Sequence, residues 1–110
     1  MAIGNTGLLG SASVAGTTSA WTKIYTCPGS TSAAIEVIFN AAGAALTDYS
    51  WAISAQTSTP AASEVRESAS ALFPRSPSIV TTSIGPGQSV FVQSAGGGLN
   101  CIVNGLEETH

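Results

Sequence analysis

Short apolar stretches separated by glycine and proline are the feature that most restricts the fold of this chain. Glycine occurs 12 times and proline 5 times in 110 residues. Residues 85–88 (GPGQ) and 96–98 (GGG) are typical of tight turns, because glycine adopts backbone angles closed to other residues and proline fixes φ. Turn signals this frequent suit strands better than helices, which need a longer uninterrupted pattern. The sequence therefore predicts an all-β chain.

Two segments show the two-residue period of a β-strand most clearly. In residues 33–40 and 46–54, apolar and aromatic side chains alternate with small or polar ones. This alternation is typical of strands with one face in a core, and β-branched and aromatic residues favour strands. The expected core side chains of the two segments are Ile35, Val37, Phe39, Tyr49, Trp51 and Ile53.

Further strands complete a sandwich of seven or eight. They are expected at residues 8–14, 20–26, 64–67, 76–82, 89–94 and 99–104. Residues 61–72 (AASEVRESASAL) also have helical propensity, so one or two helical turns are the alternative for that segment. Short strands at spacings of roughly ten residues predict a single-domain antiparallel β-sandwich or jelly-roll-like fold.

The ends of the chain are expected to differ from this body. Residues 1–19 are predicted to be a mostly irregular N-terminal arm with room for one strand, and residues 20–106 are predicted to be the β-sandwich domain. Residues 107–110 (EETH) are predicted to be a loose polar tail.

Two cysteines, Cys27 and Cys101, lie far apart in the sequence. Neither belongs to a CxxC pair, so the usual zinc-binding spacings are missing. They form either one disulfide or two buried thiols. Buried thiols are favoured, because Cys27 ends one expected strand and Cys101 lies inside another.

Charged residues make up only 8% of the chain, against about a quarter in an ordinary soluble domain. A surface of small polar side chains loses little hydration energy when a partner covers it. It also has little electrostatic protection against association. The composition therefore favours a subunit of an assembly, with a secreted monomer of bland surface as the alternative.

Neither nucleic acid nor a membrane is an expected partner. The three basic residues, Lys23, Arg66 and Arg75, are scattered, whereas nucleic-acid binding needs several cations on one face. No apolar run reaches the length of about 18 residues that a membrane-spanning helix needs.

Catalysis is not expected. The only histidine, His110, is the last residue, where the fixed geometry of acid–base chemistry is hard to maintain. Glu36 and Asp48 lie on neighbouring expected strands and are the best carboxylate pair, but solvated faces explain them better. Glu64 and Glu67 are explained as surface charges beside Arg66. No cofactor or metal is expected, since acidic residues are too sparse for calcium.

The aromatic side chains Trp21, Tyr25, Tyr49 and Trp51 allow two interpretations. They are either a platform for binding sugar or anchors of the core and of an interface. The second is favoured, because a small sandwich needs most of its large apolar side chains to build a core.

Residues 24–31 (IYTCPGST) resemble the opening of small virion proteins of tailed bacteriophages, whose pattern reads YT(C/V)PAGKT. The apolar strand at 34–40, the segments 85–94 (GPGQSVFVQS) and 103–108 (VNGLEE) are similar to later parts of the same pattern. The chain departs from it at positions 29 and 30, where Gly-Ser replaces Ala-Gly-Lys.

The resemblance implies a virion structural protein without catalytic residues, most simply a head decoration (cement) protein. It implies binding to the major capsid protein and to copies of itself, with a trimer favoured. The expected location of the protein is the outer surface of the virus particle. The particle is expected to assemble in the cytoplasm of the bacterial host. A tail or fibre accessory subunit and a carbohydrate-binding or adhesive module are the alternatives. The residues expected to make contacts are Ile3, Leu8, Leu9, Trp21, Tyr25 and Phe73.

Overall fold

A computed structural model describes residues 2–14, 20–42, 46–72, 76–94 and 98–109. Its strands are β1 (Ala2–Val14), β2 (Thr22–Thr26), β3 (Thr31–Ala41), β4 (Leu46–Ser54), β5 (Val65–Leu72), β6 (Ser78–Ile84), β7 (Ser89–Ser94) and β8 (Leu99–Thr109). One short 3₁₀ helix, η1 (Ala62–Glu64), precedes β5.

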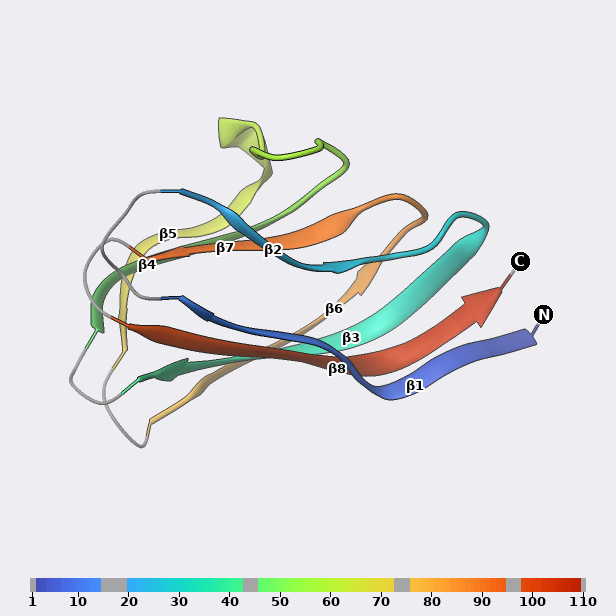
Figure 1. Ribbon diagram of the computed structural model, residues 1–110, viewed down its shortest axis with the longest axis horizontal. Coiled ribbons are helices and arrows are strands. Elements are labelled where there is room, and N and C mark those ends of the chain that lie inside the picture. Colours follow the sequence, from blue (N-terminus) through green and yellow to red (C-terminus); the bar gives the residue numbers. More distant parts are fainter. Residues whose placement is uncertain (1, 15–19, 43–45, 73–75, 95–97, 110) are drawn as a thin grey trace.

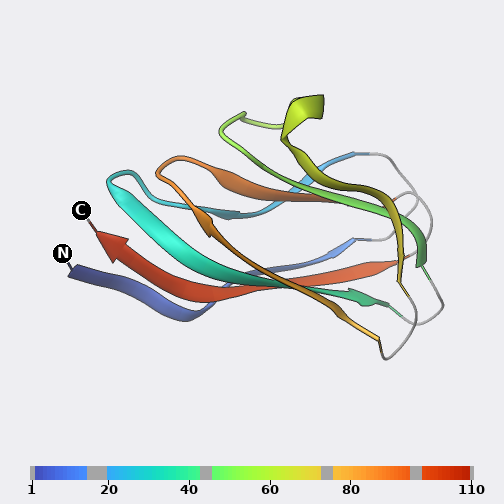
Figure 2. The same ribbon diagram turned by 180° about the vertical axis from the view of Figure 1, so that it is seen from behind.

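The strands form two antiparallel four-stranded sheets packed face to face, which confirms the predicted β-sandwich (Figure 1). Sheet A has the strand order β1-β8-β3-β6, and sheet B has the order β2-β7-β4-β5. The view from behind shows the same two layers, with both chain ends at one end of sheet A (Figure 2).

Two predicted strands, 46–54 and 89–94, have the bounds of β4 and β7 in the structure. The strand predicted at 8–14 is confirmed, but the expectation that the arm is mostly irregular was wrong, because β1 extends from Ala2 to Val14 and pairs with β8. β1 supplies backbone hydrogen-bond partners to the side of β8 that β3 does not cover. A sequence of small residues such as GSAS does not reveal this pairing.

The expectation of a loose tail was also wrong, because β8 continues to Thr109. It pairs with β3 at eleven successive positions, from Ala41 opposite Leu99 to Thr31 opposite Thr109. In residues 61–72 the helical alternative is limited to η1, and a strand follows it. Backbone pairing with β4 outweighs the modest helical propensity of that segment.

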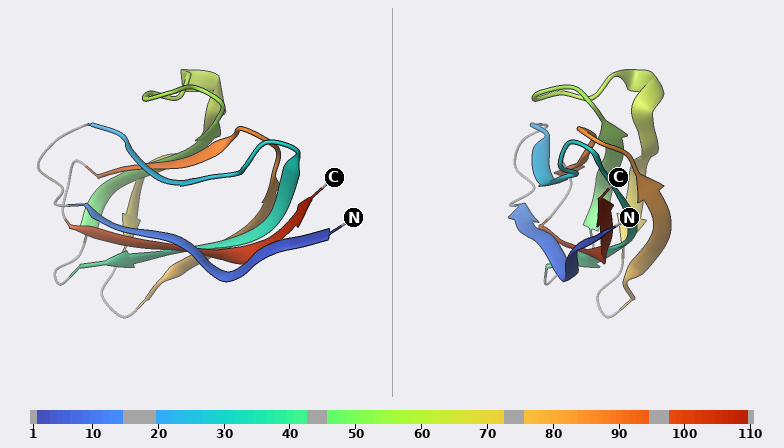
Figure 3. Two further views of the ribbon diagram at one scale, coloured as in Figure 1. Left: turned by 45° about the vertical axis from the view of Figure 1, so that its right-hand side comes forward. Right: turned by 90° about the vertical axis from the view of Figure 1, so that its right-hand side faces the viewer.

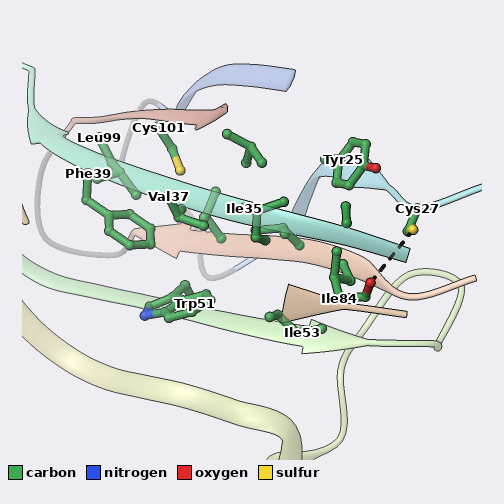
Figure 4. Close-up of a cluster of buried hydrophobic side chains, with 14 of the residues drawn as sticks. Tyr25, Cys27, Ile35, Val37, Phe39, Trp51, Ile53, Ile84, Leu99 and Cys101 are labelled. Carbon is green, nitrogen blue, oxygen red and sulfur yellow. Dashed lines mark hydrogen bonds between the residues drawn. The ribbon is translucent and has the colours of Figure 1, made fainter. Parts of the chain in front are cut away.

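The core lies between the two sheets (Figure 4). The ring of Phe39 in β3 lies 5.2 Å from that of Tyr49 and 5.5 Å from that of Trp51, both in β4, measured between centroids. Tilted ring pairs at this separation stabilise the contact beyond the burial of area alone. All six predicted core side chains of β3 and β4 are buried: Ile35, Val37, Phe39, Tyr49, Trp51 and Ile53.

Two glycines allow backbones to approach closely. A Cβ on Gly10 in β1 would lie 2.5 Å from the carbonyl oxygen of Ile24 in β2, so glycine lets one edge of sheet A approach sheet B. A Cβ on Gly105 in β8 would lie 2.3 Å from the carbonyl oxygen of Ala34 in β3. Both contacts involve backbone atoms, which cannot rotate away as a side chain does.

We expect Gly105→Ala to lower the free energy of unfolding by about 1–3 kcal/mol, because the methyl group forces β8 away from β3. Chemical denaturation followed by tryptophan fluorescence measures the change. Gly29→Ala is the matched control, since a Cβ there meets no atom within 4 Å. Equal stability of the two variants would contradict the close packing of β8 on β3.

Candidate functional site

The face of sheet A that points away from the core exposes most of the large apolar side chains found at the surface of the described residues. Ile3 is 69% exposed, Leu8 65%, Ile79 56% and Leu106 36%. Ile3 and Leu8 lie on β1, Leu106 on β8 and Ile79 on β6. We call this surface the outer face of sheet A. Apolar side chains gathered on one face typically mark an interaction surface.

The strand register adds a row of isoleucines to this face. Ile38 in β3 lies opposite Ile102 in β8 and opposite Ile79 in β6. Ile38 and Ile102 are half-buried and alternate with buried side chains of the core. The row therefore crosses three strands on the outer face.

Charge is sparse on the outer face of sheet A. Glu36, opposite Thr81, and Glu108, opposite Ile3, are the acidic residues that the register places there. The basic residues within the described part of the chain, Lys23 and Arg66, lie on β2 and β5 of sheet B. The Nζ of Lys23 lies 5.5 Å from the ring centroid of Phe91, in a cation–π contact.

The structure brings some of the predicted contact residues to this face and places others elsewhere. Ile3 and Leu8 are exposed on it, whereas Leu9 packs partly against the core and Trp21 is half-buried. Tyr25 is 7% exposed and belongs to the core, so its ring is not a surface contact in this chain. Phe73 lies outside the described residues.

A buried carboxylate, that of Glu107, joins the two sheets on the side of β1 and β2. Its Oε2 accepts a hydrogen bond of 2.5 Å from the hydroxyl of Tyr25 in β2, and its Oε1 accepts one of 3.1 Å from the backbone N–H of Asn5 in β1. Burial, together with the hydrogen bond to Glu107, raises the pKa of Tyr25. We call these three groups the Glu107 clip.

Glu107 is not among the residues predicted from the sequence, although the sequence carries a signal for it. Leu99, Cys101 and Val103 alternate as buried residues of β8, and the same alternation carried onward reaches Glu107. The alternation is hard to recognise at Glu107, because this residue is charged and lies in a polar segment. The carboxylate is accepted in the interior because hydrogen bonds replace part of its hydration.

A second carboxylate, that of Glu67 in β5, fixes two core aromatics. Its Oε1 accepts hydrogen bonds of 3.2 Å from the hydroxyl of Tyr49 and from the indole Nε1 of Trp51. Burial raises the pKa of Tyr49. Tyr49 is 1% and Trp51 3% exposed, so the two rings present no platform to a sugar and the core interpretation is confirmed for them.

The structure places the two members of the predicted carboxylate pair, Glu36 and Asp48, on different sheets. Glu36 lies on β3 in sheet A and Asp48 on β4 in sheet B. Glu64 accepts hydrogen bonds from the hydroxyl of Ser54 and the backbone N–H of Ala61, which lower the pKa of its carboxyl.

Residues 2–14, 20–42, 46–72, 76–94 and 98–109 contain no cluster of metal-ligating side chains. They enclose no pocket. They also contain no helix long and apolar enough to cross a membrane.

Both cysteines are free and buried, which confirms the preference for thiols over a disulfide. The thiol of Cys27 lies 3.2 Å from the carbonyl oxygen of Thr31 and 3.9 Å from that of Ile84, and its single S–H can donate to either. Figure 4 draws the contact with Ile84. Burial raises the pKa of Cys101 to about 12 and also raises that of Cys27.

Comparison of the chain with protein-family models, with curated proteins and with solved structures finds no match. The resemblance to small virion proteins therefore stays a prediction from the sequence.

We expect Tyr25 and Glu107 to be energetically coupled, because Tyr25→Phe leaves a buried carboxylate without one of its donors. A double-mutant cycle with Tyr25→Phe and Glu107→Gln should give a coupling energy of about 1.5–3 kcal/mol in the free energy of unfolding. The matched control replaces Glu107→Gln with Glu108→Gln, on the outer face of the same strand. Coupling no larger than that of the control pair would remove the Glu107 clip as a stabilising contact.

We also expect stability to fall as the pH rises above 9. The usual pKa of a cysteine thiol is 9.0, so the unfolded chain loses the Cys101 proton there, whereas the folded chain keeps it to about pH 12. This thiol therefore stabilises the fold fully below pH 9 and progressively less above it. Between pH 8 and pH 10 the native chain should lose about 1.4 kcal/mol more than Cys101→Ala does. Denaturant titrations at both pH values measure this, and equal losses would contradict it.

Proposed function

We propose that the protein is a structural protein of a bacteriophage virion, in first place a decoration (cement) protein on the outer surface of the head. In this role it binds the major capsid protein and copies of itself, with a trimer as the stoichiometry that the resemblance favours. It acts by contact and without a catalytic step or a cofactor. Assembly takes place in the host cytoplasm, and the two free buried thiols agree with this reducing compartment.

The observation that carries this proposal is the outer face of sheet A. Its exposed apolar side chains lie on β1, β8 and β6, and among the described residues only Glu36 and Glu108 bring charge to it. The centres of protein interfaces are depleted of charged residues in the same way. Covering one exposed leucine or isoleucine contributes about 1.5–3 kcal/mol before the entropy lost on association is subtracted.

A single contact of this kind is weak, and repetition makes it effective. A shell presents the same binding surface many times, and an oligomer that engages several copies at once converts later contacts into intramolecular ones. A small, flat sandwich of 43 × 28 × 17 Å suits a layer applied to the outside of a shell.

A tail or fibre accessory subunit is the second candidate, and the same low-charge face supports it. The two roles differ in the surface bound and not in the chemistry of the site. A carbohydrate-binding module is less well supported, because Tyr49 and Trp51 hold their polar atoms on Glu67 inside the structure.

Co-sedimentation with mature, undecorated capsids at physiological salt tests the proposal. We expect saturable binding, and we expect Ile3→Gln together with Leu8→Gln to weaken it by about tenfold or more, since both side chains leave water on binding. The melting temperature should stay unchanged, because both side chains are already exposed.

Thr57→Gln together with Ser58→Gln is the matched control, since both residues are exposed and lie between β4 and η1, outside sheet A. The control should bind capsids as the native chain does. Absence of capsid binding by the native chain, with binding to isolated tails or fibres, would replace the decoration role by the second candidate. Saturable glycan binding without particle binding would overturn both.

A further inference from the structure

Each sheet of the sandwich ends in two edge strands, and an unprotected edge is a template for pairing with another chain. Sheet A ends in β1 and β6, and sheet B in β2 and β5. In the end-on view of Figure 3, β1 and β6 lie at opposite sides of sheet A. The four edges differ sharply in how they are protected.

Three of the edges carry the usual obstacles to pairing. β1 has two register irregularities against β8, and Gly7 within it has a positive φ of 86°. β2 is only five residues long, has an irregularity and carries Lys23. β5 carries Arg66 and Glu67 and has three irregularities against β4. Bulges, charges and short length all discourage a further strand.

The fourth edge, β6, has none of these obstacles. Its sequence, SIVTTSI, contains no charge, no proline and no glycine, and β-branched residues dominate it. It pairs with β3 at seven successive positions without an irregularity. In an antiparallel pair only every second residue directs its N–H and C=O to the neighbour, so the others on β6 point away from β3.

We infer that β6 is a self-association edge: it pairs antiparallel with β6 of a second copy of this chain, around a two-fold axis near Thr81. The two copies of sheet A then form one continuous eight-stranded sheet. The outer faces of both copies lie on the same side of that sheet, because directly paired residues of antiparallel strands share a face.

Side-chain chemistry at the edge fits a second copy. With the axis at Thr81, this threonine lies opposite its own equivalent, and Ile79 lies opposite Ser83 of the second copy. Threonine pairs across strands are favourable. Ile79 is 56% exposed in the single chain and gains cover from the added strand.

Charge favours this edge contact over stacking of two outer faces. Glu36 lies opposite Thr81, one strand inside the edge. In the paired sheet the two Glu36 side chains lie three strand spacings apart, about 14 Å, which exceeds the Debye length of about 8 Å at physiological salt. Stacked outer faces would instead enclose Glu36 and Glu108 with no lysine or arginine from the described residues of that face.

The contact does not depend on capsid binding, and it uses a different surface from Ile3 and Leu8. A two-fold contact through β6 therefore leaves the outer face near β1 open. It can link subunits, or oligomers of another symmetry, side by side in a layer.

Sedimentation equilibrium of the purified full chain tests the inference. We expect a monomer–dimer equilibrium in the native protein. Thr81→Lys together with Ser83→Lys should raise the dimer dissociation constant by about tenfold or more, since like charges lie opposite at the axis. Within one chain the new lysine at 81 faces Glu36, so the monomer keeps its fold.

Ser11→Lys together with Asn100→Lys is the matched control, because both residues are exposed and lie on the outer face away from β6. The control should dimerise as the native chain does. Equal weakening in both variants would show that the outer face, and not the edge, makes the contact. A native chain that stays monomeric at about 1 mM, or forms only multiples of three that neither variant affects, overturns the inference and leaves the capsid role standing.

Amide hydrogen exchange of the native chain gives a second readout that needs no variant. At a concentration where the dimer forms, alternate amides of β6 should exchange more slowly than in the dilute protein, while those of β1 and β5 do not change. Concentration-independent exchange along β6 would contradict the edge contact.

Discussion

The backbone pairing of β3 with β8 is the interaction on which the rest of the structure depends. Eleven successive positions are paired without an irregularity, from Thr31 opposite Thr109 to Ala41 opposite Leu99. This ladder fixes which side chains of sheet A face the core and which face outward, because a slip of one residue would exchange the two faces. It also places β1 and β6 at opposite edges of sheet A and brings Glu107 inside.

Two carboxylates accept hydrogen bonds from polar atoms of aromatic residues that the apolar core itself cannot pair. Glu107 takes the hydroxyl of Tyr25 from the opposite sheet, and Glu67 takes the polar atoms of Tyr49 and Trp51. Each acid lets an aromatic residue bury its ring while its polar atom keeps a partner. A chain with few charges therefore uses two of them for internal organisation, which leaves even fewer for the surface.

The surface of sheet A offers two kinds of contact, one on its outer face and one at its edge strand β6. The outer face of sheet A presents apolar side chains such as Leu8 and Leu106, and its contacts rest on burial of area. The edge at β6 presents backbone hydrogen-bonding groups, and its contacts rest on direction and register. In the role proposed above, a layer of subunits binds a shell with the outer face near β1 and its neighbours with the edge at β6, because these two regions lie at opposite sides of sheet A.

The sequence by itself determined the all-β class, the bounds of 46–54 and 89–94, the inward phase of Ile35, Val37 and Phe39, and the scarcity of surface charge. Period-two alternation and turn residues act locally, so they can be read without the fold. Only the tertiary structure decided that the strand predicted at 8–14 begins at Ala2, that residues 107–109 continue β8 and that Glu107 is buried. Those outcomes depend on which strand lies beside which, since partners far apart in sequence supply the hydrogen bonds and the cover. Strand order alone made β6 an edge.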